Sequence, residues 1–189
     1  MKIHILGASG SGVTTLGKYL GSHLSVPYFD NDNFYWEKTD IPFTVKRNPE
    51  QRNQLLESTL GMHENWILGG SMLNWNNEDL ISSFDLVVFL WIPAEIRLER
   101  LRKREFDRYG EQIFDNPEQI KKTQDFLDWA SGYDINATNT TRTISNHTKW
   151  LAALKSPVLA IEGDFTVSQR IHIVQEKLIE LGFLPKNNA

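Results

Sequence analysis

The chain has 189 residues, of which 40% are hydrophobic, and a net charge of −4 from 20 Lys and Arg against 24 Asp and Glu. This length and apolar content fit one domain, which we expect to span residues 1–189. The small negative charge gives no overall positive field, so we expect neither nucleic acid nor membrane as a partner. The absence of cysteine removes disulfides and thiolate chemistry. No apolar run reaches the ~20 residues of a membrane span, so we expect a cytoplasmic protein.

Hydrophobic patterning predicts strands that alternate with helices along the chain. Short apolar runs indicate strands at residues 2–6, 26–29, 66–68, 86–92 and 157–161. The runs at 66–68 and 86–92 lack polar alternation, as expected of parallel strands covered on both faces. Helical spacing and capping signals indicate helices over residues 13–24, 49 to about 61, 95 to about 109, from 117 onward, and from 167 to about 181. The polar segment 132–147 is predicted to be a loop. We therefore expect a three-layer α/β domain with an open parallel sheet of about five strands, helices on both faces, and ligands at the carboxyl ends of the strands.

A glycine-rich segment lies directly between the first predicted strand and the first predicted helix. It matches the phosphate-loop pattern Gly-x-x-x-x-Gly-Lys-Ser/Thr except at Val13, which replaces the lysine. The glycines let backbone N–H groups converge on an anion at the helix N-terminus, and Thr14 has a hydroxyl suited to Mg²⁺. The residues expected to hold nucleotide phosphates are Gly7, Gly10, Ser11, Gly12, Val13, Thr14 and Thr15.

The missing lysine affects the expected function. It removes a charge-assisted hydrogen bond worth roughly 1.5–3 kcal/mol and a donor whose loss can cost about 10²–10³ in rate, so binding should survive better than catalysis. Lys18 lies four residues after Thr14 on the same helix face and is a candidate substitute, although a solvated surface lysine is the alternative. The main rival is a dinucleotide-binding turn, because Asp30 follows the second predicted strand; its glycine spacing fits less well.

Taken with these motifs, the chain resembles the adenylate kinase and shikimate kinase group of P-loop kinases over nearly its whole length. Phe29-Asp30-Asn31-Asp32 is similar to the Asp-x-Asp that ends the second strand of shikimate-kinase-like enzymes. The resemblance implies that Asp30 serves Mg²⁺ through water and that Asp32 serves the acceptor substrate. Mg²⁺ needs only one or two carboxylates beside phosphates, which agrees with this division. Residues 66–71 resemble the next strand and its glycine-rich end, which implies substrate contact at Gly70, but Gly69 replaces an Asp often found there.

The second half of the chain adds a basic helix to this resemblance. Residues 84–93 and the charged stretch after them resemble the strand and lid-entry helix of adenylate kinases, in which two arginines four residues apart face the phosphates. Arg100 and Arg104 match these positions and share a helix face, although a solvated charged helix is the alternative. The resemblance also implies a lid-like segment at 105–148, containing Arg108 and Arg142, and a substrate-binding insertion at 33–63, containing Arg47.

The sequence thus predicts a P-loop NTPase fold that binds ATP or GTP with Mg²⁺. We expect it to transfer the γ-phosphoryl group to a small acceptor, either a nucleotide, a nucleoside or a hydroxylated metabolite. Arg100 and Arg104 would offset charge, and Asp32 would orient the acceptor. Val13 and Gly69 motivate the alternative of a nucleotide-responsive binding module with little or no transferase activity. The identity of the acceptor, the preferred base and the oligomeric state stay open.

Overall fold

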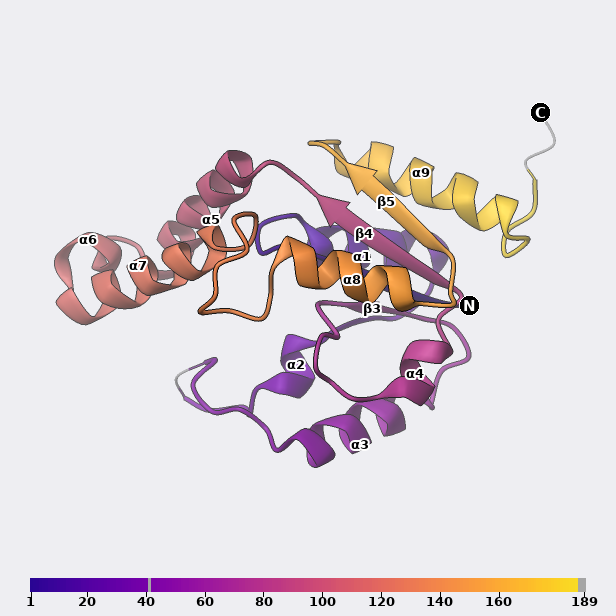
Figure 1. The fold of residues 1–189 in the computed structure, drawn as a ribbon, viewed down its shortest axis with the longest axis horizontal. Helices are drawn as coiled ribbons and strands as arrows, with labels where there is room; N and C mark the ends of the chain where they lie inside the picture. The colour runs from indigo at the N-terminus through magenta and orange to yellow at the C-terminus, as the bar shows by residue number, and fades with distance from the viewer. Residues whose placement is uncertain (41, 187–189) are drawn as a thin grey trace.

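A computed structural model describes residues 1–40 and 42–186, so residue 41 of the expected insertion and residues 187–189 lie outside the described part. One sheet of parallel strands has the order β2-β3-β1-β4-β5 (Figure 1). The strands are β1 (Lys2–Gly7), β2 (Tyr28–Asp30), β3 (Trp66–Gly69), β4 (Leu86–Trp91) and β5 (Val158–Glu162). The described helices are α1 (Val13–Leu24), α2 (Asp32–Tyr35), α3 (Pro49–Leu60), α4 (Glu78–Ser82), α5 (Ala94–Tyr109), α6 (Gln112–Asp115), α7 (Pro117–Ser131), α8 (Ile144–Ala153) and α9 (Val167–Glu180). None of these helices is long and apolar enough to cross a bilayer.

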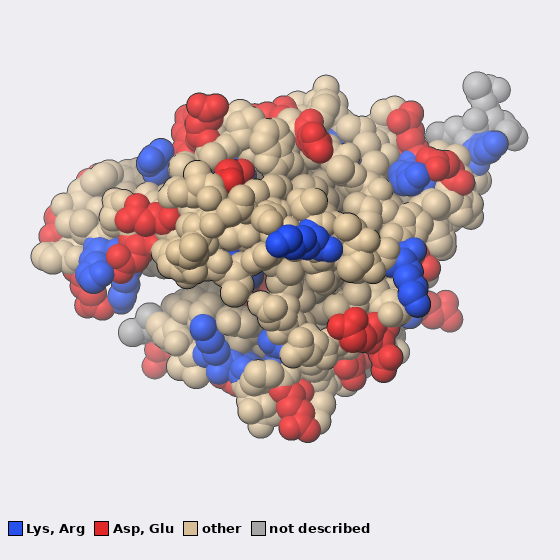
Figure 2. All heavy atoms as spheres, viewed as in Figure 1, with Lys and Arg blue, Asp and Glu red and all other residues tan. Residues whose placement is uncertain are grey.

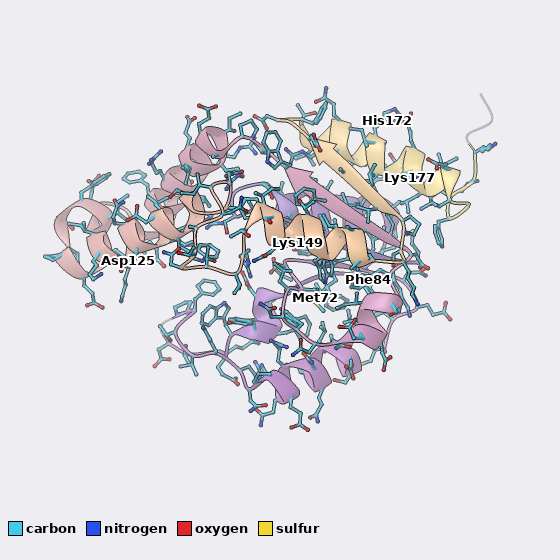
Figure 3. All side chains as sticks on the ribbon, in the orientation of Figure 1. Met72, Phe84, Asp125, Lys149, His172 and Lys177 are labelled. Atoms are coloured by element: carbon cyan, nitrogen blue, oxygen red, sulfur yellow. The ribbon has the colours of Figure 1, made fainter. Side chains whose placement is uncertain are left out.

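The sheet has an apolar core on each face. Successive strand residues point to opposite faces, so Ile3 and Ile5 pack against α1 and α9, whereas Leu6 packs with α3, α4 and α8 on the other side. Met72 and Phe84, labelled in Figure 3, belong to this second core. The predicted five-stranded parallel sheet with helices on both faces is therefore confirmed.

The order of the strands excludes the alternative hypothesis of a doubly wound dinucleotide-binding fold. In the doubly wound dinucleotide fold the second strand pairs with the first. Here β3 lies between β1 and β2, and Asp30 at the end of β2 aligns with Gly69 of β3. The carboxyl end of β2 therefore faces β3, and its acidic residues lie beside the glycine-rich end of that strand.

The predicted helix at 13–24 and the predicted helix starts at residues 49, 117 and 167 are confirmed, but the loop prediction at 132–147 is partly wrong. Asn48, Asn116 and Thr166 cap α3, α7 and α9 through their side chains. Within the segment predicted to be a loop, Thr143 caps α8, which was not predicted. The apolar stripe of α8 is interrupted by His147, a fully buried polar side chain, so the sequence lacks the expected hydrophobic period. The short helices α2, α4 and α6 were also not predicted.

Two buried histidines make the stability of the fold depend on pH. Burial lowers the pKa of His4 to about 3 and that of His147 to about 4. Because both values lie below the ordinary 6.5, the unfolded chain binds these protons first as the pH falls. The free energy of unfolding contributed by each histidine is therefore complete above about pH 6.5 and decreases below it, by about 1.4 kcal/mol per pH unit, until the folded pKa is reached.

Replacing His4 with leucine is expected to reduce the loss of stability in acid. Between pH 6 and 4.5 the variant should lose about 1.4 kcal/mol less per pH unit than the wild type, because one of the two buried histidines no longer titrates. Urea unfolding at several pH values measures this slope. His172, 72% exposed on α9 (Figure 3), gives the matched variant His172→Gln, which removes a histidine that lies outside the core. An unchanged slope in His4→Leu would contradict the assignment.

Candidate active site

A cleft of about 620 Å³ opens at the carboxyl ends of β1, β2 and β3. Its charged lining consists of five arginines and two aspartates, namely Arg100, Arg104, Arg108, Arg142, Arg170, Asp30 and Asp32. Acidic and basic side chains are interspersed over the outer face seen in Figure 2. The cleft is therefore a local cationic site on a chain whose net charge is negative, as anion binding requires.

The phosphate loop forms one wall of this cleft. Gly10 and Gly12 have φ angles of 82° and 92°, in the left-handed region that favours glycine, and a Cβ on Gly10 would lie 2.7 Å from the Arg97 carbonyl oxygen. α1 begins at Val13, and among the described side chains none caps its first turn. The first N–H groups of a helix lack intrahelical partners, so these amides are available to an anion in the cleft.

Val13 lines the cleft at the position where the motif has lysine. Its partly buried side chain also packs against the core between the sheet and α1. The valine therefore adds apolar contact at the start of the helix and supplies no charge to the loop.

Two buried arginines from distant helices donate hydrogen bonds to backbone carbonyl oxygens of the phosphate loop. Arg97 Nη1 donates to the carbonyl oxygen of Ser9 at 3.1 Å, and Arg170 Nη1 donates to that of Ser11 at 2.8 Å. Among the described residues, Arg170 Nε and Nη2 have no hydrogen-bond partner, and Asp164 is 3.7 Å away as an ion pair. A buried guanidinium with unused donors beside a phosphate loop is suited to bind an anion. Sequence reasoning missed Arg170 because α9 follows the loop by about 150 residues and carries no motif.

The predicted metal-binding pair is brought together. Thr14 Oγ1 donates to Asp30 Oδ2 at 2.9 Å, and the Tyr28 hydroxyl donates to the same oxygen at 2.9 Å. The donor set of one hydroxyl and one carboxylate fits Mg²⁺, which takes oxygen ligands and keeps several waters. No cluster of three or more potential metal-binding acids or histidines occurs in the described part of the chain. An ion that also binds phosphate oxygens requires no such cluster.

Tyr28 explains the departure at Gly69. A Cβ on Gly69 would lie 2.3 Å from the Tyr28 hydroxyl, and one on Gly17 would lie 2.1 Å from its ring. The tyrosine therefore occupies space that only two glycines leave open, including the place of the side chain that the family often has at position 69. Its hydroxyl donates to the Asp30 carboxylate and restricts the orientation of that side chain. Sequence reasoning missed this role, for which the glycine in the middle of α1 was the available signal.

Asp32 lines the cleft together with Arg104, Arg108 and Arg142. The side chain is exposed by surface area, but surrounding protein limits its hydration. This burial, followed by repulsion from Asp30, raises the pKa of Asp32 above its usual range. Arg142, Arg104 and Arg108 oppose the increase, so their charges act directly on this carboxylate.

The predicted catalytic arginines both line the cleft, with different partners. Arg100 forms an ion pair with Asp164, on the loop between β5 and α9. Arg104 lies 3.8 Å from Glu105 and over the Phe126 ring.

Some predicted site residues lie elsewhere. The cleft lining also includes Gly7, Gly10, Gly12, Thr15 and Gly70, whereas Ser11 of the loop is buried and does not line the cleft. Lys18 is exposed on α1 outside the cleft lining. Arg47 also lies outside this lining, where it donates to the carbonyl oxygens of Phe34 and Trp36 and pairs with Glu37.

Comparisons with known proteins identify the family of the chain. A family model named AAA_18, described as an AAA domain, matches residues 3–121. Uncharacterized protein YqaC of Bacillus subtilis (strain 168) is 47% identical over 176 residues, which cover 93% of this chain and 96% of YqaC. A shikimate kinase of Acinetobacter baumannii (strain AYE) is 29% identical over 134 residues, which cover 66% of this chain and 72% of the enzyme. The crystal structure of a shikimate kinase from Bacteroides thetaiotaomicron matches with a TM-score of 0.55 at 18% identity, covering 95% of this chain and 98% of that one. The chain therefore belongs to the AAA_18 family of P-loop domains, within the shikimate and adenylate kinase-like P-loop kinases.

Proposed function

We propose that the protein transfers the γ-phosphoryl group of ATP or GTP to a hydroxyl oxygen of a small acceptor. The supporting observation is the lining of one cleft, which brings together the phosphate loop, the hydrogen-bonded Thr14–Asp30 pair, and Asp32 with several arginines whose charges act on it. A kinase of this class needs little covalent chemistry from the protein and depends on positioning and charge neutralisation. The cleft supplies both.

The phosphate loop would bind the triphosphate through the backbone N–H groups of residues 10–15. Arg170 would add charge beside Gly12, where its Nη1 lies 2.8 Å from the position of a glycine Cβ. Thr14 and Asp30 would hold Mg²⁺, which neutralises phosphate charge when bound. Tyr28 would keep Asp30 directed at that position.

Asp32 would act on the acceptor hydroxyl. In its ionised form the carboxylate can accept the hydroxyl proton as the acceptor oxygen bonds to the γ-phosphorus and the bond to the bridging oxygen breaks. The raised pKa of Asp32 makes it a better base than an ordinary aspartate. Arg100 and Arg104 would stabilise the charge that develops on the transferring group.

The segment 105–148 would serve as a lid and the segment 33–63 would hold the acceptor. Figure 1 shows α6 and α7 extending away from the sheet beyond α5. Arg108, near the end of α5, and Arg142, just before α8, come from this segment and line the cleft, so a movement of the segment that carries them would change the charge beside Asp32. Closure over the cleft would exclude water from the transferring group.

A coupled assay for ADP or GDP production tests the proposal. Candidate acceptors are hydroxylated carboxylates such as shikimate, nucleosides and nucleoside monophosphates, with a nucleotide-binding titration run in parallel. We expect turnover with at least one acceptor above the rate of hydrolysis. Val13 and Gly69 motivate the second candidate, a binding module, which would be favoured by tight nucleotide binding without turnover on any acceptor.

A further inference from the structure

Three side chains from distant parts of the chain form a buried hydrogen-bond chain that ends in the cleft. Ser71, which follows β3, has its Oγ 2.9 Å from His147 Nε2. His147 Nδ1 lies 2.8 Å from the hydroxyl of Tyr133. Ser71 is 5% exposed, His147 0% and Tyr133 3%, and Ser71 lines the cleft. The mechanism above uses none of these residues.

The Tyr133 hydroxyl determines which atoms donate and which accept in these two hydrogen bonds. Burial raises the pKa of Tyr133, so its hydroxyl keeps its proton. Within the described part of the chain, the only hydrogen-bond partner of this hydroxyl is His147 Nδ1. An unpaired buried O–H is costly, so Tyr133 donates and Nδ1 accepts.

Because Nδ1 accepts from Tyr133, the hydrogen bond between His147 and Ser71 must be donated by the histidine. His147 has a lowered pKa of about 4 and is neutral at pH 7, so it carries one ring proton. With Nδ1 accepting, that proton is on Nε2 and is donated to Ser71 Oγ. The backbone N–H of Leu73 donates to the same oxygen at 3.3 Å. Both lone pairs of the hydroxyl oxygen are then used, and Ser71 can only donate its own proton.

We propose that Ser71 binds an anionic oxygen of the acceptor substrate as a hydrogen-bond donor oriented by His147 and Tyr133. The inference rests on the proposed function and specifies its substrate class, a hydroxylated carboxylate or a phosphate monoester. A hydroxyl that can only donate selects an oxygen that accepts. The charge of Arg142 acts on both Asp32 and His147, so a cation lies near this donor as well as near the base. The acceptor would then present its hydroxyl to Asp32 and its anionic group to Ser71.

Nitrogen NMR of histidine-labelled protein tests which ring nitrogen of His147 carries the proton. We expect His147 to carry its proton on Nε2 in the wild type, and to populate both tautomers in Tyr133→Phe. This measurement needs no substrate and is independent of activity. A proton on Nδ1 in the wild type would make Ser71 the donor to His147 and would overturn the inference.

Titrations followed on the Ser71 and Leu73 amide signals test the ligand class. The probes are shikimate and glycerol 3-phosphate, with methyl shikimate and glycerol as their neutral counterparts. We expect at least one anion, but neither neutral compound, to shift these signals. Ser71→Ala should weaken that anion about ten- to hundredfold, and Ser71→Thr, which keeps the hydroxyl, should restore most of the affinity.

The outcomes separate this inference from the proposed function. Absence of a shift with both anions, or equal affinity in wild type and Ser71→Ala, would overturn the role of Ser71. Thermal melting of each variant identifies any loss of folding, and Tyr133→Phe, which changes no atom in contact with the anion, should still weaken binding severalfold. Anion binding with the expected tautomer but without phosphoryl transfer to any acceptor would contradict the proposed function and leave the role of Ser71 intact.

Discussion

Replacing Asp32 with asparagine is expected to lower turnover by about 10²–10⁴-fold while the affinity for nucleotide changes little. The amide keeps the shape of the side chain but cannot accept the hydroxyl proton. It also removes the negative charge that faces Arg142, Arg104 and Arg108. Steady-state kinetics with the acceptor identified by the coupled assay, together with a nucleotide titration, would separate the two effects.

Asp125 on α7 provides the matched control. Its side chain, labelled in Figure 3, is exposed, pairs only with Lys121 among the described residues and is not part of the cleft lining. Asp125→Asn should retain wild-type turnover, because Asp125 is not part of the cleft lining. It should also retain the wild-type stability, because an exposed ion pair contributes little. Because Asp32 has a raised pKa and must be ionised to act, wild-type turnover should also fall as the pH decreases through that pKa. Unchanged turnover in Asp32→Asn would contradict its role as the base.

Replacing Arg170 with methionine is expected to weaken nucleotide binding about ten- to hundredfold, and adding Val13→Lys should recover most of the loss. Arg170 is one of two buried arginines beside the loop, and its Nε and Nη2 have no hydrogen-bond partner among the described residues, which suits a phosphate. A lysine at position 13 supplies the charge that the family motif has there. Calorimetry with ATP and GTP on the wild type, the two single variants and the double variant measures this coupling.

Lys18 and a conservative substitution are the controls for this series. Lys18→Ala should bind nucleotide as the wild type does, because Lys18 lies outside the cleft lining. Arg170→Lys keeps the positive charge and should retain much of the affinity for nucleotide. Loss of the hydrogen bond from Arg170 to the Ser11 carbonyl oxygen would lower the melting temperature of a variant. Equal affinity in wild type and Arg170→Met, or an effect of Lys18→Ala as large as that of Arg170→Met, would contradict the assignment.

Much of the fold could be predicted from local sequence patterns. Strands such as β4 are continuous apolar runs, and caps such as Asn48 with Pro49 determine helix starts through contacts within a few residues. The phosphate loop and the Asp-x-Asp segment each follow a predicted strand. Their meeting at the edge of the sheet follows from the parallel topology, and the Thr14–Asp30 hydrogen bond agrees with that prediction.

The remaining parts of the site depend on contacts between distant segments. Arg170 reaches the loop from the last helix, and Tyr28 reaches Asp30 because Gly17 and Gly69 leave room for its ring. The hydrophobic pattern of α8 is incomplete because His147, a buried polar residue, occupies a position that is usually apolar. Sequence patterns reflect contacts within a few residues, so contacts between such distant segments cannot be predicted from them.

Nucleotide binding with and without Mg²⁺, measured by calorimetry on wild type, Thr14→Ala and Thr14→Ser, tests the central claim most directly. The Thr14 hydroxyl donates to Asp30 at the edge of the phosphate loop. We predict that ATP binds the wild type more tightly with Mg²⁺, that Thr14→Ala loses this gain, and that Thr14→Ser keeps it. Undetectable ATP and GTP binding to the wild type, or an equal gain from Mg²⁺ in Thr14→Ala, would contradict nucleotide binding at this loop.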